Sequence, residues 1–200
     1  ATELSVHPGT ASLELFLMAH DNPMPSDWVR RWTPLIPRHG TVLDLACGRG
    51  RHLHWLASQG LSVLGVDRDA DALASAAAWG ETLQADLEQG AWPLAGRTFS
   101  GIVVTHYLWR ATWQHLLDTL APGGVLIYET FSRQHAQIGK PSRDDFLLRP
   151  GELIERCAEL RIVAYEDGFL PHPDRFIQRI VAVRENSPSA STARYPLSLE

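Results

Sequence analysis

The segment 41–50 constrains the fold of this chain most, because an apolar run there breaks directly into a glycine-rich turn. Residues 41–45 (TVLDL) have the composition of a buried strand and include one acid, Asp44. Gly48 and Gly50 can adopt backbone conformations that a Cβ atom disfavours. A helix beginning near residue 51 would then point unpaired N–H groups at a ligand. The pattern predicts a strand, a turn and a helix that grip a cofactor.

Two more acids follow apolar runs further along the chain. Asp67 closes the run 61–66, and Asp86 closes the short run 83–85. In an open parallel sheet the carboxyl ends of the strands lie at one edge, where such folds bind their ligands. An acid at the end of the second strand is placed to accept hydrogen bonds from ribose hydroxyls. We therefore expect the three acids to surround one nucleoside-bearing cofactor.

Strands and helices alternate along most of the chain, which favours an α/β fold with helices covering a mainly parallel sheet. The periodicity predicts a helix capped by Ser26 and further helices over residues 51–58, 69–79 and 111–120. It predicts strands over residues 41–45, 61–66, 81–85, 99–105, 125–130, 160–166 and 176–183. Only nine residues, two of them proline, separate the last two strands. A parallel return needs about a dozen residues or more, so the last strand is expected to run antiparallel.

The length and composition fit one globular domain. A chain of 200 residues with 44% hydrophobic residues can bury a proper core but leaves little room for a second domain. We assign the domain to residues 41–184. The N-terminal segment 1–40 carries a helix and can act as a lid, and residues 185–200, rich in Ser, Ala and Pro, are expected to form a flexible tail. The sequence leaves the choice between a monomer and a homodimer open.

Charge and cysteine content disfavour several classes of protein. The net charge is −5 and the basic residues are scattered, so no nucleic-acid partner is expected. No run approaches the roughly twenty apolar residues that cross a membrane, and the apolar stretch 13–19 lacks a basic leader. With two cysteines and no Cys–His cluster, neither a disulfide framework nor a metal site is expected. A cytoplasmic location is the simplest expectation.

Residues 41–183 resemble the class I S-adenosylmethionine-dependent methyltransferases. Four short motifs carry the resemblance: residues 44–50 (DLACGRG), 65–67 (GVD), 85–87 (ADL) and 120–124 (LAPGG). The family has a three-layer, Rossmann-like fold with a mostly parallel seven-stranded sheet whose last strand is antiparallel. The chain is also similar to small bacterial methyltransferases of the tellurite-resistance type, which act on small molecules. The resemblance therefore implies S-adenosylmethionine as cofactor and transfer of its methyl group to a small-molecule acceptor.

The resemblance also implies which residues hold the nucleoside end of the cofactor. Gly48 and Gly50 would line its methionine part, and Asp67 would hold its ribose. Asp86 and the backbone N–H of Leu87 would recognise adenine.

At the methionine end the implied roles depend on charge. Asp44 would lie near the ammonium group, and Arg51 and His52 would meet the carboxylate. Ala46 stands where the family has its first glycine. Arg68 stands where an apolar residue often packs on adenine, and its guanidinium can stack on that ring instead.

Arg68 also keeps a second cofactor class open, because an arginine beside the ribose acid accommodates the 2′-phosphate in some NADP enzymes. A dinucleotide fingerprint starting at Gly48 would need a small residue where this chain has Leu53, which argues against an NADP-dependent oxidoreductase. Two other functions stay open. One is a non-catalytic module that binds S-adenosylmethionine, and the other is a methyltransferase that acts on nucleic acid or protein.

Two side chains are candidate general bases on the acceptor side of the site. His106 follows the fourth predicted strand and titrates near neutrality, and Glu129 lies in the fifth and would serve as a base only if its pKa were raised. The alternative is structural, with His106 satisfied by the backbone and Glu129 paired with Arg110.

The same region holds the candidate substrate contacts. These are Tyr107, Arg110, Phe131, Lys140 and Arg143. Tyr107 and Phe131 can form an aromatic wall. The polar segment 132–148 is long for a connection and is expected to cover the acceptor site. Its Lys140 and Arg143 would favour an anionic acceptor.

Overall fold

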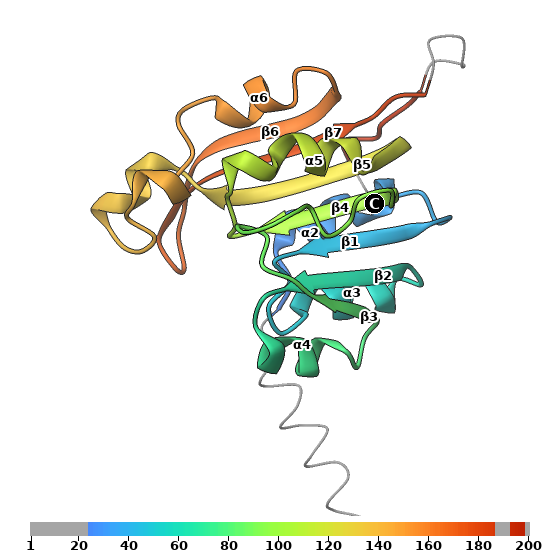
Figure 1. The fold of residues 1–200 in the computed structure, drawn as a ribbon. Helices are drawn as coiled ribbons and strands as arrows, with labels where there is room; N and C mark the ends of the chain where they lie inside the picture. The colour runs from blue at the N-terminus through green and yellow to red at the C-terminus, as the bar shows by residue number, and fades with distance from the viewer. Residues whose placement is uncertain (1–23, 187–192, 199–200) are drawn as a thin grey trace, which may run out of the picture.

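A seven-stranded sheet with helices on both faces forms the molecule (Figure 1). The computed structural model describes residues 24–186 and 193–198, so most of the predicted N-terminal lid and part of the predicted tail lie outside the described residues. The strands are β1 (Thr41–Leu45), β2 (Ser62–Asp67), β3 (Glu81–Gln84), β4 (Phe99–Thr105), β5 (Leu120–Phe131), β6 (Arg161–Leu170) and β7 (Arg175–Val183). The α-helices are α2 (Asp27–Trp32), α3 (Arg51–Ser58), α4 (Ala70–Ala76), α5 (Trp113–Asp118) and α6 (Glu152–Arg156). Short 3₁₀ helices are η1 (Thr33–Leu35), η2 (Arg110–Thr112), η3 (Arg133–Gln137) and η4 (Asp144–Phe146).

The strand order is β3-β2-β1-β4-β5-β7-β6. The first five strands of this order pair in parallel, whereas β7 is antiparallel to both of its neighbours, β5 and β6. The predicted fold class, with its antiparallel last strand, is therefore confirmed. The last strand does not lie at the edge of the sheet. It inserts between β5 and β6, which leaves β6 as the edge strand.

The connection between β6 and β7 is shorter than predicted. β6 continues to Leu170 and β7 begins at Arg175, so a four-residue turn joins them. Phe169 pairs with Phe176 across this hairpin, and the centres of the two rings lie 5.1 Å apart. Cross-strand pairs of this kind stabilise a sheet. They extend both strands into residues whose local pattern favours a loop.

Each face of the sheet has its own hydrophobic core. α5 and α6 cover one face, where Trp113 and Leu153 pack in a cluster with Tyr128 of β5 (Figure 1). α2 and α3 cover the opposite face with Trp28 and Leu53. All seven residues of β4 are buried, because this central strand is covered on both sides. The two layers of helices leave the carboxyl edge of the parallel strands for the site.

Two helices end earlier than the sequence predicts, whereas α3 has the predicted bounds. α4 stops at Ala76 rather than at residue 79, and α5 stops at Asp118 after a 3₁₀ turn that begins at Arg110. Trp79 lies beyond α4, and its ring lies 4.0 Å from that of His54 on α3.

The 132–148 segment is tied at both ends. The N–H of Leu148 donates to the carbonyl of Phe131 (3.0 Å), and the N–H of Arg133 donates to the carbonyl of Leu148 (2.9 Å). η3 and η4 lie between these anchors. The segment is therefore an anchored excursion from the carboxyl end of β5, and its predicted role of covering the acceptor site stays a prediction.

Candidate active site

The turn after β1 has three residues in the left-handed region. Ala46 has a φ of 56°, Gly48 of 54° and Gly50 of 82°. A Cβ atom at Gly50 would lie 2.8 Å from the Cβ atom of Ala76 on α4, so this position requires glycine. The N–H of Cys47 donates to the carbonyl of Val66 (3.0 Å), which joins the turn to the end of β2. The backbone of the turn is thus fixed from two sides.

Asp67 at the end of β2 faces this turn. Its Oδ2 accepts a hydrogen bond from the N–H of Gly48 (2.8 Å), and its Oδ1 accepts one from the N–H of Asp69 (3.0 Å). Asp86, after β3, accepts a hydrogen bond from the N–H of Glu88 (2.9 Å). Both carboxylates are partly exposed at the same edge of the sheet.

Two adjoining cavities lie along this edge. The first has a volume of about 170 Å³ and is lined by Ala46, Asp67, Arg68, Ala85, Asp86, Leu87, Glu88 and Tyr107. The second has a volume of about 340 Å³ and is lined by Ala46, Cys47, Gly48, Arg49, Arg51, His52, Thr105 and His106. The two cavities share Ala46. Eight of the ten residues predicted to bind the cofactor line one cavity or the other, and the remaining two are Asp44 and Gly50.

Asp44 is a buried carboxyl group in the central part of the sheet, on β1. Within the described part of the chain, its Oδ2 has no hydrogen-bond partner. Burial raises its pKa to about 8, with a further contribution from the charge of Asp67 and an opposing one from Arg51. An unpaired buried carboxyl group is costly unless a cation or a donor reaches it. A cation beside Asp44 would offset this cost, although the side chain itself lines neither cavity.

His52 is buried and held on both sides of its ring. Its Nε2 accepts a hydrogen bond from the N–H of Ser26 (3.1 Å), and its Nδ1 lies 3.4 Å from Oγ1 of Thr105. Burial, and then the positive charges of Arg51 and His106, lower its pKa to about 3. The ring is neutral at physiological pH. His52 lines the second cavity, and its predicted contact with a carboxylate stays a prediction, one that a neutral ring would have to make without a positive charge.

His106 stands at the rim of the second cavity, with a left-handed φ of 55°. Its N–H donates to the carbonyl of Glu129 (2.9 Å), and its ring stacks on Phe131 with 4.8 Å between ring centres. The other side of Phe131 stacks on His135 at 4.4 Å. Partial burial, and then the charges of Arg51 and Arg175, lower the pKa of His106 to about 4. The imidazole is therefore neutral at physiological pH, but it does not titrate near neutrality as the residue type predicts, and its low pKa makes it a weak proton acceptor.

Glu129 is buried and engaged by other side chains. It accepts hydrogen bonds from Oγ of Ser26 (2.9 Å) and from Nη1 of Arg179 (3.4 Å). The alternative that pairs Glu129 with Arg110 is wrong. Glu129 lies opposite Arg179 in the antiparallel β5–β7 pair, which the insertion of β7 creates.

The five predicted substrate contacts are not all brought together. Tyr107 lines the first cavity, and Phe131 stacks on His106 beside the second. Arg110 lines neither cavity, because its guanidinium binds Glu152 and backbone carbonyls. Arg143 is 72% exposed and pairs with Asp145 (2.8 Å), and Lys140 is exposed. Neither of these last two lines the cavities described above.

A second arginine that the sequence did not indicate lies near this site. The Nε of Arg175, the first residue of β7, is buried and has no hydrogen-bond partner among the described residues. After burial, its charge contributes to lowering the pKa of Arg51 and of His106. Arg51 forms no ion pair with any described residue. Arg51 of α3 lines the second cavity, and the charge of Arg175 on β7 acts on two of the residues that line it, although Arg175 itself lines neither cavity. No local motif marks Arg175, because its place depends on the position of β7 in the sheet.

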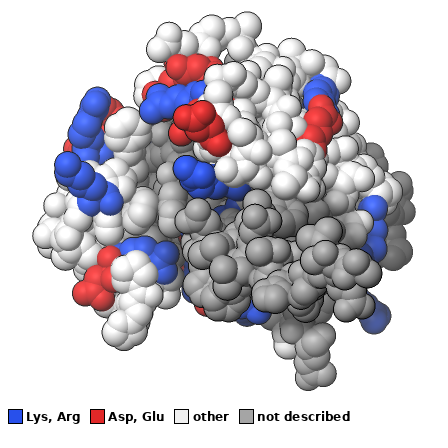
Figure 2. All heavy atoms as spheres, turned by 90° about the horizontal axis from the view of Figure 1, so that it is seen from below, with Lys and Arg blue, Asp and Glu red and all other residues white. Residues whose placement is uncertain are grey.

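Charged side chains elsewhere are mixed in sign. On the described part of the face in Figure 2, basic side chains stand beside acidic ones and form no continuous basic surface. Within residues 24–186 and 193–198, no group of three or more His, Cys, Asp or Glu side chains is placed to hold a metal ion. The helices of the same ranges include none that is long and apolar enough to cross a membrane.

Comparisons with known proteins agree with this architecture. Residues 42–124 match a family model described as a methyltransferase domain. TehB from Haemophilus influenzae is similar in structure, with a TM-score of 0.67 at 18% identity over 83% of this chain, which spans 64% of that protein's chain. A TehB-like SAM-dependent methyltransferase from Corynebacterium glutamicum has a TM-score of 0.60 at 17% identity, over 86% of this chain and 95% of its own. The glycopeptide N-methyltransferase MtfA, in complex with S-adenosyl-L-homocysteine, has a TM-score of 0.56 at 16% identity, over 89% of this chain and 98% of its own. No curated protein sequence matches this chain.

Proposed function

We propose that the chain is a class I S-adenosylmethionine-dependent methyltransferase, which the methyltransferase-domain match of residues 42–124 and the fold support, and that it methylates a small-molecule acceptor. The observation that carries the proposal is the pair of cavities that meet at Ala46. One adjoins the strand-end acids Asp67 and Asp86, and the other adjoins Arg51 and His106. This arrangement offers a nucleoside site and a reaction site side by side.

The first cavity fits the nucleoside end of S-adenosylmethionine. Asp67 would accept hydrogen bonds from the ribose hydroxyls, and Asp86 with the N–H of Leu87 would recognise adenine. Arg68 would stack on the adenine ring from the rim. The cofactor supplies an activated methyl group on a sulfonium when it is bound.

The residues around the second cavity fit the methionine end. Arg51, at the start of α3, would meet the carboxylate, and Asp44 would meet the ammonium group. The unpartnered Oδ2 of Asp44 supports this assignment, because a cation would offset the cost of its burial. Gly48 and Gly50 would keep the backbone close to the ligand.

The acceptor would lie beside Thr105, the last residue of β4, and beside His106, whose ring stacks on Phe131. For an in-line displacement the protein mainly orients the acceptor and excludes water. Glu129 is held by Ser26 and Arg179, and His106 is neutral but only a weak base. An acceptor that is already ionised would need no proton transfer to either residue. The charges of Arg51 and Arg175 favour an acceptor that carries an anionic group.

Calorimetric titration with S-adenosylhomocysteine, beside NADH and NADPH, tests the proposal. We expect micromolar binding of S-adenosylhomocysteine and none of either nicotinamide. Binding of NADH or NADPH without binding of S-adenosylhomocysteine would contradict the assigned cofactor. A screen of small thiols, oxyanions and carboxylates for methylated product then tests the acceptor class, and binding of cofactor with no turnover of any acceptor would favour a non-catalytic binding module.

The affinity for S-adenosylhomocysteine should rise with pH up to about 8. Asp44 is largely protonated at neutral pH because its pKa is raised to about 8, and only its ionised form attracts an ammonium group. Below about pH 8 the affinity should therefore increase by up to about tenfold per pH unit, and it should level off above that. Titrations across this range measure the effect. Asp44→Asn should bind more weakly and with no such dependence, and an affinity of the parent protein that stays constant from neutral pH to above 8 would contradict the role of Asp44.

A further inference from the structure

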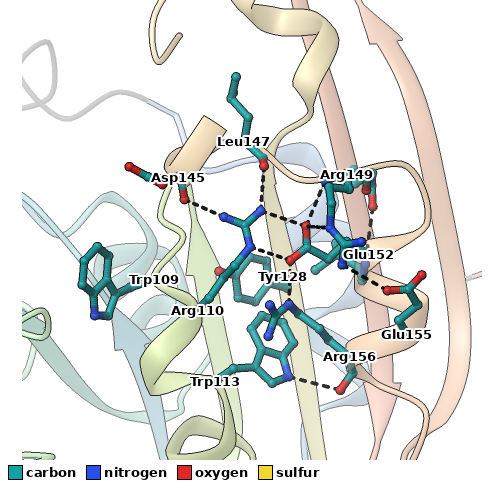
Figure 3. Close-up of polar contacts among 12 residues, drawn as sticks. Trp109, Arg110, Trp113, Tyr128, Asp145, Leu147, Arg149, Glu152, Glu155 and Arg156 are labelled. Atoms are coloured by element: carbon teal, nitrogen blue, oxygen red, sulfur yellow. Dashed lines mark hydrogen bonds and ion pairs between the residues drawn. The ribbon is translucent and has the colours of Figure 1, made fainter. Parts of the chain in front are cut away.

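Several segments meet at one buried carboxylate, Glu152, in the first turn of α6 (Figure 3). Its Oε1 accepts hydrogen bonds from Nε of Arg110 and from Nε of Arg156, each at 2.8 Å. Its Oε2 accepts from Nη2 of Arg110 (2.9 Å) and from the backbone N–H of Arg149 (2.9 Å). Burial alone would raise the pKa of Glu152, but these hydrogen bonds outweigh it and lower the pKa to about 2. The carboxylate is therefore ionised and fully paired.

Arg110 uses every donor of its guanidinium in this cluster. Two of its five N–H groups bind Glu152, as described above. The other three donate to backbone carbonyls of the 132–148 segment, those of Asp144 (3.4 Å), Asp145 (2.9 Å) and Leu147 (2.8 Å). Figure 3 shows the guanidinium between the segment and α6. No donor is left for a ligand, so Arg110 can affect the site only through the parts that it connects.

The loop that leads to Arg110 and the segment that Arg110 binds both adjoin His106. Arg110 ends the short loop after β4 that begins with His106 and Tyr107, and the hydroxyl of Tyr128 donates to the carbonyl of Tyr107 in the same loop (2.6 Å). The 132–148 segment begins directly after Phe131, the residue on which His106 stacks. Arg110 therefore links the loop that carries His106 to the segment that follows its stacking partner.

We infer that Arg110 is a positioning residue for the acceptor side of the site. It holds His106 and Phe131 in register by joining their two segments through its hydrogen bonds to the carbonyls of the 132–148 segment, and Glu152 fixes its guanidinium to α6. The inference rests on the proposed function only for the role of His106 beside the acceptor. The link itself rests on contacts. The guanidinium of Arg110 binds three carbonyls of the 132–148 segment and the carboxylate of Glu152 on α6. Arg110 is joined to the loop after β4 by the polypeptide chain itself.

Arg156 provides a matched control within the same cluster. It binds the same oxygen of Glu152 at the same distance, 2.8 Å, and it is partly exposed like Arg110. Its guanidinium lies over the ring of Trp113 (5.3 Å) and contacts no carbonyl of the 132–148 segment. Loss of Arg156 removes one ion pair from Glu152 but leaves the link between the two segments.

The test compares Arg110→Met, Arg110→Lys and Arg156→Met by NMR, with and without S-adenosylhomocysteine. The ring protons of His106, assigned through His106→Gln, are shifted by the stacked ring of Phe131. We expect this shift to shrink by half or more in Arg110→Met and in Arg110→Lys, because lysine keeps the charge but lacks the planar fork of donors. The shift should stay at the parent value in Arg156→Met, although both methionine variants lose stability.

An unchanged His106 shift in the Arg110 variants, or an equal change in Arg156→Met, would overturn the inference and leave the cluster as a stabilising contact only. Arg110→Lys keeps the comparison possible if Arg110→Met does not fold. A parent protein that fails to bind S-adenosylhomocysteine would contradict the proposed function, but the comparison of His106 in the ligand-free proteins would still decide whether Arg110 links the two segments.

Discussion

Asp67→Ala should weaken the binding of S-adenosylhomocysteine by roughly 100-fold or more, the largest effect that we expect at the cofactor site. Hydrogen bonds to a charged group each contribute about 1.5–3 kcal/mol, and Asp67 is proposed to accept two from the ribose. The substitution also removes the acceptor of the Gly48 N–H, which helps to shape the turn. Calorimetric titration of the variant measures the loss.

Asp71→Ala is the matched control for this experiment. Asp71 also carries a carboxylate and lies in the first turn of α4, where its side chain is exposed and does not line either cavity. The Asp71→Ala variant should bind S-adenosylhomocysteine as tightly as the parent protein does. Thermal unfolding of both variants checks that each is folded, and an affinity of Asp67→Ala equal to that of Asp71→Ala would place the nucleoside elsewhere.

Glu152→Gln should lower the free energy of unfolding by about 3 kcal/mol, toward the lower end of the range for breaking a buried ion pair. The amide cannot satisfy the four donors that converge on the carboxylate, because its NH₂ group would face two of them whichever oxygen it replaced. The loss stays near that lower end because the side chains of Arg110 and Arg156 are 31% and 22% exposed and can turn toward water. Equilibrium unfolding in urea measures the difference.

The loss of stability caused by Glu152→Gln should be smaller at low pH. The pKa of Glu152 is lowered in the folded protein from 4.5 to about 2, so its stabilising contribution is full above about 4.5 and is lost as the pH falls through about 2. The difference in the free energy of unfolding between the parent protein and Glu152→Gln should therefore become smaller as the pH falls from about 4.5 to about 2. Glu155→Gln, on the same helix, removes a carboxylate that is 65% exposed, and it should change stability by no more than about 0.5 kcal/mol. A Glu152→Gln variant as stable as Glu155→Gln would contradict the prediction.

The parts of the fold that depend on local sequence were predictable. The glycine turn follows β1 where the apolar run ends, and β4 occupies residues 99–105 as its buried run indicates. The acids Asp67 and Asp86 line one cavity because the carboxyl ends of parallel strands lie at one edge.

The contacts that depend on pairing between distant parts of the chain could not be predicted from the sequence. The partner of Glu129 is Arg179, fifty residues away, and the partner of Arg110 is Glu152. Both pairs require the position of β7 and α6 in three dimensions, which no periodicity in the sequence encodes. The neutral state of His52 has the same origin, because it follows from burial against Ser26 and Thr105 and not from the residue type.

The insertion of β7 between β5 and β6 has a consequence for the order in which the site is made. A chain is synthesised from its N-terminus, and its parts can begin to fold before the rest is complete. β1, β2 and the glycine turn leave the ribosome early, but β6 has no strand to pair with until β7 follows it and enters the sheet. β7 also carries Arg179, which binds Glu129, and Arg175, whose charge acts on His106. The nascent chain therefore contains the elements of the nucleoside cavity well before the strand that completes the reaction side exists.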